Sequence, residues 1–161
     1  MLGRIPPMLS FTDGIYLENA KETLRWGCTR KQAWRVGKPA SRFPGDDTRI
    51  QWEETLLGGL SCGLLAYLPD ETVLDEASVW LRAREGVYRG DDSVFHYLTF
   101  FDHLVQQLGT PSSIRSGAGS FYAPILTWQR DGCALQLVTG ERHGDFTILE
   151  ITKGKTPRYA A

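Results

Sequence analysis

The stretch DSVFHYLTFFDHLVQQLGTP, residues 92–111, carries the clearest helical pattern in the chain. Its apolar side chains recur at intervals of three and four residues, which places them on one face of a helix. Asp92 or Ser93 can cap the first turn, and the Gly-Thr-Pro at the end stops the helix. We therefore expect a helix over residues 93–108. The expected buried stripe is Val94, Tyr97, Leu98, Phe101, Leu104, Val105 and Leu108.

Three short segments rich in apolar and β-branched residues follow this helix. They predict strands over residues 125–129, 134–139 and 146–153, separated by turns that contain glycine. A helix followed by three antiparallel strands buries one helix face against one sheet face. The second half of the chain is therefore predicted to be such a unit.

The first half of the chain repeats the same order of features. Helical patterns over residues 17–26 and 30–36, the second capped by Thr29, end at Gly37-Lys38-Pro39. Predicted strands then cover residues 48–54, 60–68 and 73–82. Trp52 and Cys62 follow in the order that Trp128 and Cys133 keep in the second half. This repeat predicts an α+β fold, with two tandem helix-then-antiparallel-sheet halves forming one compact domain.

The length of 161 residues fits one domain, and 42% hydrophobic residues are enough for a folded core. We expect a lead-in over residues 1–12, the first half over 13–83 and a connector over 84–92. The second half then spans residues 93–153, and a loose tail spans 154–161.

Composition also limits where the chain is expected to act. The net charge is −1, so overall charge does not favour nucleic acid or membrane binding. The first ten residues lack the pattern of a signal peptide, and the apolar run 56–68 is too short to cross a membrane. Three widely spaced cysteines do not form a disulfide framework. These features predict a cytoplasmic protein.

The sequence contains no complete catalytic motif. Ser61-Cys62-Gly63 lacks the glycine pattern of a nucleophile elbow, and there is no CxxC pair for zinc. His96 and His103 would lie about 10 Å apart along a helix, too far for one metal ion. We therefore expect no enzyme, no cofactor and no metal. The rival hypothesis is an active site assembled from His143, Asp145 and Cys133.

Charge and aromatic residues suggest a binding surface instead. The early segment is basic and the middle of the chain is acidic, a distribution that can steer a partner of opposite charge. Trp52 and Trp128 are expected in the core, whereas four other aromatic residues are candidates for a surface: Trp34, Trp80, Tyr88 and Tyr122. The candidate partner-binding residues, chosen from polar connections, are Tyr88, Asp91, Asp92, Arg142 and Asp145.

The Gly-x-Pro stop, the tryptophan strand and the antiparallel meander, in tandem over residues 26–65 and 95–151, resemble beta-lactamase inhibitor protein modules. The plan is also similar to small immunity proteins that neutralise bacterial toxins of type VI and Rhs systems. The first half departs from it by having two short helices. The resemblance implies an immunity protein that binds a cognate toxin and occludes its active site. The alternatives are a chaperone or adaptor for a secreted protein and the enzyme above. We expect no membrane, nucleic-acid or small-molecule partner.

Overall fold

The computed structural model describes residues 9–82, 92–117, 123–141 and 145–159, and for residues 92–94 and 145 it describes the backbone alone. Within these ranges the chain forms ten strands and two helices. The first half contains β1 (Gly14–Leu17), β2 (Glu22–Arg25), α1 (Arg30–Ala33), β3 (Ala40–Ser41), β4 (Arg49–Leu56), β5 (Leu60–Tyr67) and β6 (Glu76–Leu81). The second contains α2 (Asp92–Leu108), β7 (Ser113–Arg115), β8 (Ile125–Arg130), β9 (Cys133–Glu141) and β10 (Asp145–Lys153).

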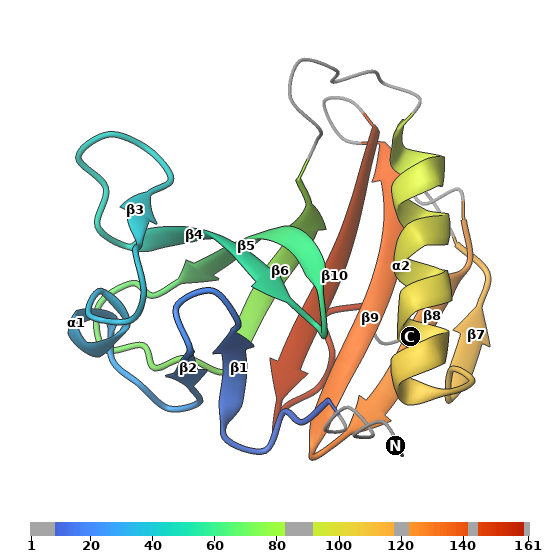
Figure 1. The fold of residues 1–161 in the computed structure, drawn as a ribbon, viewed down its shortest axis with the longest axis horizontal. Coiled ribbons are helices and arrows are strands. Elements are labelled where there is room, and N and C mark those ends of the chain that lie inside the picture. Colours follow the sequence, from blue (N-terminus) through green and yellow to red (C-terminus); the bar gives the residue numbers. More distant parts are fainter. Residues whose placement is uncertain (1–8, 83–91, 118–122, 142–144, 160–161) are drawn as a thin grey trace, which may run out of the picture.

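One antiparallel sheet of eight strands dominates the fold (Figure 1). Its order is β3-β4-β5-β6-β10-β9-β8-β7, while β1 and β2 form a separate hairpin. The predicted α+β fold of two helix-then-sheet halves is therefore wrong, because the first half has one helix of four residues and the remainder of its regular structure is strand. In the described part of the chain, no helix is long and apolar enough to cross a membrane.

Residues 17–26, predicted to be a helix, instead form most of the β1–β2 hairpin. Ile15, Leu17 and Leu24 are all fully buried, and the spacing of Ile15 and Leu17 is the period of two of a strand. The hairpin depends on Gly14, since a Cβ atom there would lie 2.0 Å from the Leu24 carbonyl oxygen. Residues 17, 20 and 24, which have the i, i+3, i+7 spacing of a helix, therefore lie in β1, in the turn and in β2.

The helix predicted over residues 93–108 is confirmed as α2, but its buried stripe differs from the prediction. Phe100 and Leu104 are fully buried, whereas Leu98 is 52% exposed. In the first half of the chain, Thr29 caps α1 as predicted, because its side chain accepts a hydrogen bond from Gln32 N at 3.2 Å. The six predicted strands correspond to β4, β5, β6, β8, β9 and β10.

The sheet has an internal symmetry in its strand register. Trp52 lies opposite Leu64, and Trp128 lies opposite Leu135. Each indole Nε1 donates to a backbone carbonyl where the preceding helical segment ends: Trp52 to Val36 at 2.8 Å, and Trp128 to Gly109 at 2.9 Å. The two four-stranded halves meet at β6 and β10, where Ser78 lies opposite Glu150. Ser78 and Glu150 are therefore the central pair of the sheet. The strand pairing on one side of this pair repeats the strand pairing on the other side.

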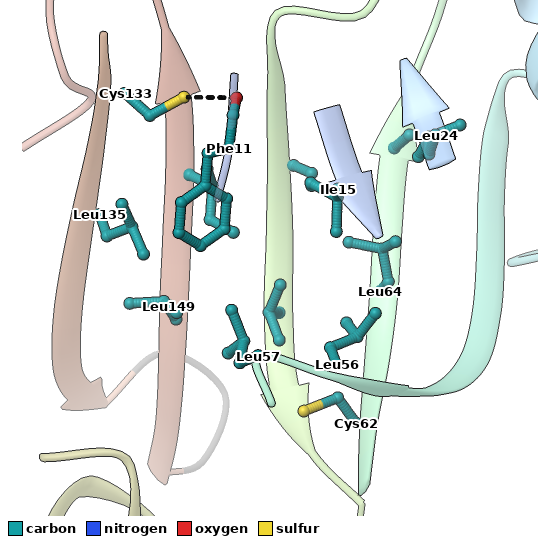
Figure 2. Close-up of a cluster of buried hydrophobic side chains, with 14 of the residues drawn as sticks. Phe11, Ile15, Leu24, Leu56, Leu57, Cys62, Leu64, Cys133, Leu135 and Leu149 are labelled. Atoms are coloured by element: carbon teal, nitrogen blue, oxygen red, sulfur yellow. Dashed lines mark hydrogen bonds between the residues drawn. The ribbon is translucent and has the colours of Figure 1, made fainter. Parts of the chain in front are cut away.

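The hydrophobic core lies on one side of the sheet. The β1–β2 hairpin and α2 both cover this side, and their buried side chains belong to one cluster with those of the strands (Figures 1 and 2). Phe11 also packs there, close to Leu135 and Leu149 (Figure 2). Its backbone N–H donates to Asp131 and its carbonyl accepts from the Trp26 indole, both at 2.8 Å. In the described end of the predicted lead-in, residues 9–12, Phe11 is thus part of the core and Leu9 packs against it.

Candidate functional site

The predicted partner-binding residues do not form a described site. Tyr88, Asp91 and Arg142 lie outside the described residues. Asp92 is the first residue of α2 and Asp145 the first of β10, and only their backbones are described. Their role in binding stays a prediction.

The rival enzyme hypothesis also stays untested, because the side chains of His143 and Asp145 are not among the described ones. His143 lies outside the described residues, and Cys133 is fully buried. Burial raises the pKa of the Cys133 thiol, which opposes formation of the nucleophilic thiolate. Among the residues that the structure describes, no group of three His, Cys, Asp or Glu side chains could hold a metal ion.

Thiol labelling at pH 8 tests this interpretation of the cysteines. Burial raises the pKa of Cys62 to about 12 and also raises the pKa of the half-buried Cys28. We expect only Cys28 to react in the native protein, slowly, and all three cysteines to react in denaturant. A Cys28→Ser variant should therefore show no native reaction. Rapid native labelling of Cys133 would contradict this expectation and favour the enzyme hypothesis.

The side of β4, β5 and β6 that faces away from the hydrophobic core is open. Along β4 and β5 the inward side chains are buried apart from the half-buried Leu60, and the outward ones are half-buried or exposed apart from Gly63. Strand register places Arg49 beside Tyr67, Gln51 beside Leu65, and Glu53 beside Gly63 and Trp80. We call this surface the aromatic–arginine face, and define it by Arg42, Phe43, Arg49, Tyr67, Trp80 and Arg82.

Trp80 lies flat on the sheet because its neighbour has no side chain. A Cβ atom at Gly63 would lie 2.1 Å from the Trp80 ring, so only glycine leaves room for the indole. The guanidinium of Arg42 lies over the indole, 5.5 Å from the ring centroid, and donates to Gln51 Oε1 at 2.9 Å. The cation–π contact and the hydrogen bond hold both side chains in one arrangement.

Arg49 is held in the same way at the other end of the face. Its guanidinium lies 4.4 Å from the Tyr67 ring centroid and 5.9 Å from that of Phe43. Asp46 accepts from Arg49 at 2.9 Å and from the backbone N–H of Thr48 at 2.8 Å. The hydrogen bonds from Thr48, followed by that from Arg49, lower the pKa of Asp46 to about 2. The contribution of the charged carboxylate to stability is therefore present above about pH 4 and is lost as the pH falls toward 2.

Exposure of large aromatic side chains is pronounced on this face. Phe43 is 54% exposed and Tyr67 is 48% exposed, while Trp80 is half-buried. Arg82 pairs with Glu53 at 3.3 Å, and both are exposed enough for the pair to add little stability. Trp, Tyr and Arg are the residues most often found at the energetic centre of protein interfaces. The face therefore combines the residue types that are frequent at such centres.

The C-terminal segment lies against β9 and β10 on the same side of the sheet. The backbone N–H of Tyr159 donates to Gln136 at 3.0 Å, and Arg158 lies 3.9 Å from the buried Glu150 carboxylate. Lys155 pairs with Asp75 at 2.9 Å. The described part of the tail, residues 154–159, which we expected to be loose, thus contacts the sheet beside the aromatic–arginine face.

Glu150 gives a prediction about pH. Burial raises its pKa, although the Ser78 hydroxyl, which donates to it at 2.8 Å, opposes the shift. A raised acid pKa means that folding is favoured below the unfolded pKa, and that this contribution is lost as pH rises through the folded pKa. Glu150→Gln should therefore raise Tm at pH 7, with the gain disappearing near pH 4. Thermal unfolding between pH 4 and pH 7 measures this difference in Tm, and Glu22→Gln, at an exposed position, is the control. A lower Tm for Glu150→Gln at pH 7 would contradict the prediction.

The sequence pointed to part of the aromatic–arginine face. Trp80 was a candidate surface aromatic, and Arg42 and Arg49 belong to the basic early segment. What the sequence did not show is that register brings them together. The signal that could have found the site is the pairing of Gly63 with Trp80 across β5 and β6.

Comparison with known proteins assigns no family to this chain. No protein-family model, curated protein or solved structure matches this chain. The resemblance to inhibitor and immunity proteins therefore stays a prediction based on the order of motifs.

Proposed function

We propose that this chain is a protein-binding inhibitor, an immunity protein that binds a cognate toxin through the aromatic–arginine face and occludes the toxin's active site. The observation that carries the proposal is the exposure of Tyr67 and Phe43 beside Trp80, with arginines between them, on an open sheet face. Aromatic and arginine side chains are enriched at protein interfaces relative to the rest of the protein surface.

Rigidity supports the same proposal. Trp80 is confined between Gly63 and Arg42, and Arg49 is confined by Asp46 and Tyr67. Side chains already ordered in the free protein lose less conformational entropy on binding, which favours tight association. An inhibitor that must block an enzyme benefits from such a fixed surface.

The strands under the face set its size. β4 and β5 have eight residues each, β6 has six and β3 has two. With strands about 4.8 Å apart and a rise of about 3.3 Å per residue, they give a patch of roughly 380 Å² in projection. This is about half of the ~800 Å² per partner of a standard interface, so we expect the partner to contact neighbouring loops as well.

Capture of a partner tests the proposal. The tagged chain is incubated with native lysate of the organism that encodes it, beside a Tyr67→Ala/Trp80→Ala variant. The matched control is Phe95→Ala/Leu98→Ala, which removes two large exposed side chains from α2 on the other side of the sheet. We expect one partner to be retained by the wild type and the control and lost by the face variant.

The purified partner then distinguishes inhibition from other binding. One equivalent of the chain should suppress its toxic activity. Capture of nothing at micromolar concentration, or equal retention by the face variant, would overturn the proposal. A client held partly unfolded, with hydrogen exchange increased in the complex, would instead indicate a chaperone.

A further inference from the structure

The three arginines of the aromatic–arginine face are not equivalent. Arg49 pairs with Asp46 at 2.9 Å, and Arg82 pairs with Glu53 at 3.3 Å. Arg42 has no carboxylate within salt-bridge distance among the described side chains; its contacts are Gln51 and the Trp80 ring. Arg42 is therefore the cation on this face whose charge is left for a partner.

The guanidinium of Arg42 is also held in a fixed position and has hydrogen-bond donors left for a partner. A guanidinium carries five N–H donors in one plane, and the Arg42 contact with Gln51 uses one nitrogen, Nη1. The ring beneath it is fixed because Trp80 rests on Gly63. A planar donor group held in place suits bidentate recognition of a carboxylate.

We infer that the partner is a protein that places an aspartate or glutamate carboxylate on the guanidinium of Arg42, which lies over the Trp80 ring. This inference rests on the proposed function and names the chemistry of the partner at that site.

A phosphate could also pair with arginine, but the face is unsuited to nucleic acid. Base stacking needs free aromatic surfaces. The Trp80 indole rests on Gly63 and has Arg42 over it, and the Tyr67 ring has Arg49 over it. A protein carboxylate is therefore the better match.

The first test uses short probes and NMR. The probes are the peptide acetyl-Gly-Asp-Glu-Asp-Gly-amide, its neutral analogue acetyl-Gly-Asn-Gln-Asn-Gly-amide, and an oligothymidylate. We expect the acidic peptide alone to shift the indole N–H signal of Trp80 and the Nε–H signal of Arg42. Arg42→Gln should abolish the Trp80 shift. Arg25→Gln, an exposed arginine on β2, should leave it unchanged. Equal shifts with the neutral peptide, or larger shifts with the oligothymidylate, would overturn the inference.

The second test separates this inference from the proposed function. With the captured partner, Arg42→Gln should weaken binding by about 30-fold or more, and Arg42→Lys by less, because lysine keeps the charge without the planar donors. If Trp80→Ala abolishes binding but Arg42→Gln binds within twofold of wild type, the carboxylate inference fails and the proposed function stands. If both variants bind as wild type does, both fail.

Discussion

Replacing Trp52 with alanine is expected to lower the free energy of unfolding by about 3–5 kcal/mol. The side chain is 1% exposed, and its Nε1 donates to the Val36 carbonyl at 2.8 Å. Alanine leaves a large cavity between the sheet and the first half's helical segment, and it leaves that carbonyl without its donor. Urea unfolding followed by circular dichroism measures the loss.

The same loss is expected for Trp128→Ala, because Trp128 is 2% exposed and makes the matching bond to Gly109 at 2.9 Å. Should the alanine variants fail to fold, Trp52→Phe and Trp128→Phe keep most of the ring and remain measurable. These variants should each lose about 1–2 kcal/mol, chiefly from the missing hydrogen bond. A loss below about 1 kcal/mol for either alanine variant would contradict the symmetric core.

Replacing Trp80 with alanine is expected to weaken binding to the cognate partner by about 100-fold, the effect of losing a central aromatic hot spot. Two contributions combine: the indole's own contact area is lost, and Arg42 loses the ring that holds its guanidinium. Isothermal titration calorimetry with the captured partner gives the affinity. Because Trp80 is half-buried, stability should change much less than for Trp52.

Two variants control this measurement. Phe95→Ala removes an exposed aromatic ring from α2, 67% exposed, and should leave affinity unchanged. Gly63→Ala should weaken binding too, because the added Cβ displaces the Trp80 ring while leaving it in the chain. Unchanged affinity for both Trp80→Ala and Gly63→Ala would exclude this face as the binding site.

The parts of the fold with a regular pattern could be predicted from sequence. The α2 helix follows from its period of three and four, and the positions of Trp52 and Trp128 follow from strand patterns and size. The β1–β2 hairpin could not be predicted in this way. Its residues 17, 20 and 24 have the spacing of a helix, whereas the hairpin depends on the close approach of Gly14 to the Leu24 backbone, which the sequence pattern does not show.

The site was harder to predict because it depends on register. Arg42, Gly63 and Trp80 are far apart in sequence and meet only when β4, β5 and β6 pair as they do. Loops were the natural place to look for partner-binding residues, since polar connections often carry function. The structure offers a sheet face instead. Arg49 lies on β4, while Arg42 and Arg82 directly follow β3 and β6, and sequence alone suggests ordinary solvated positions for all three.

Oxidative footprinting tests the central claim most directly, that the aromatic–arginine face is covered by the partner. Hydroxyl radicals label exposed aromatic side chains, and mass spectrometry compares the free chain with the complex. We predict that labelling of Phe43, Tyr67 and Trp80 falls strongly in the complex while labelling of Phe95 stays unchanged. Unchanged labelling of Tyr67 and Trp80, with protection of Phe95 instead, would contradict the account.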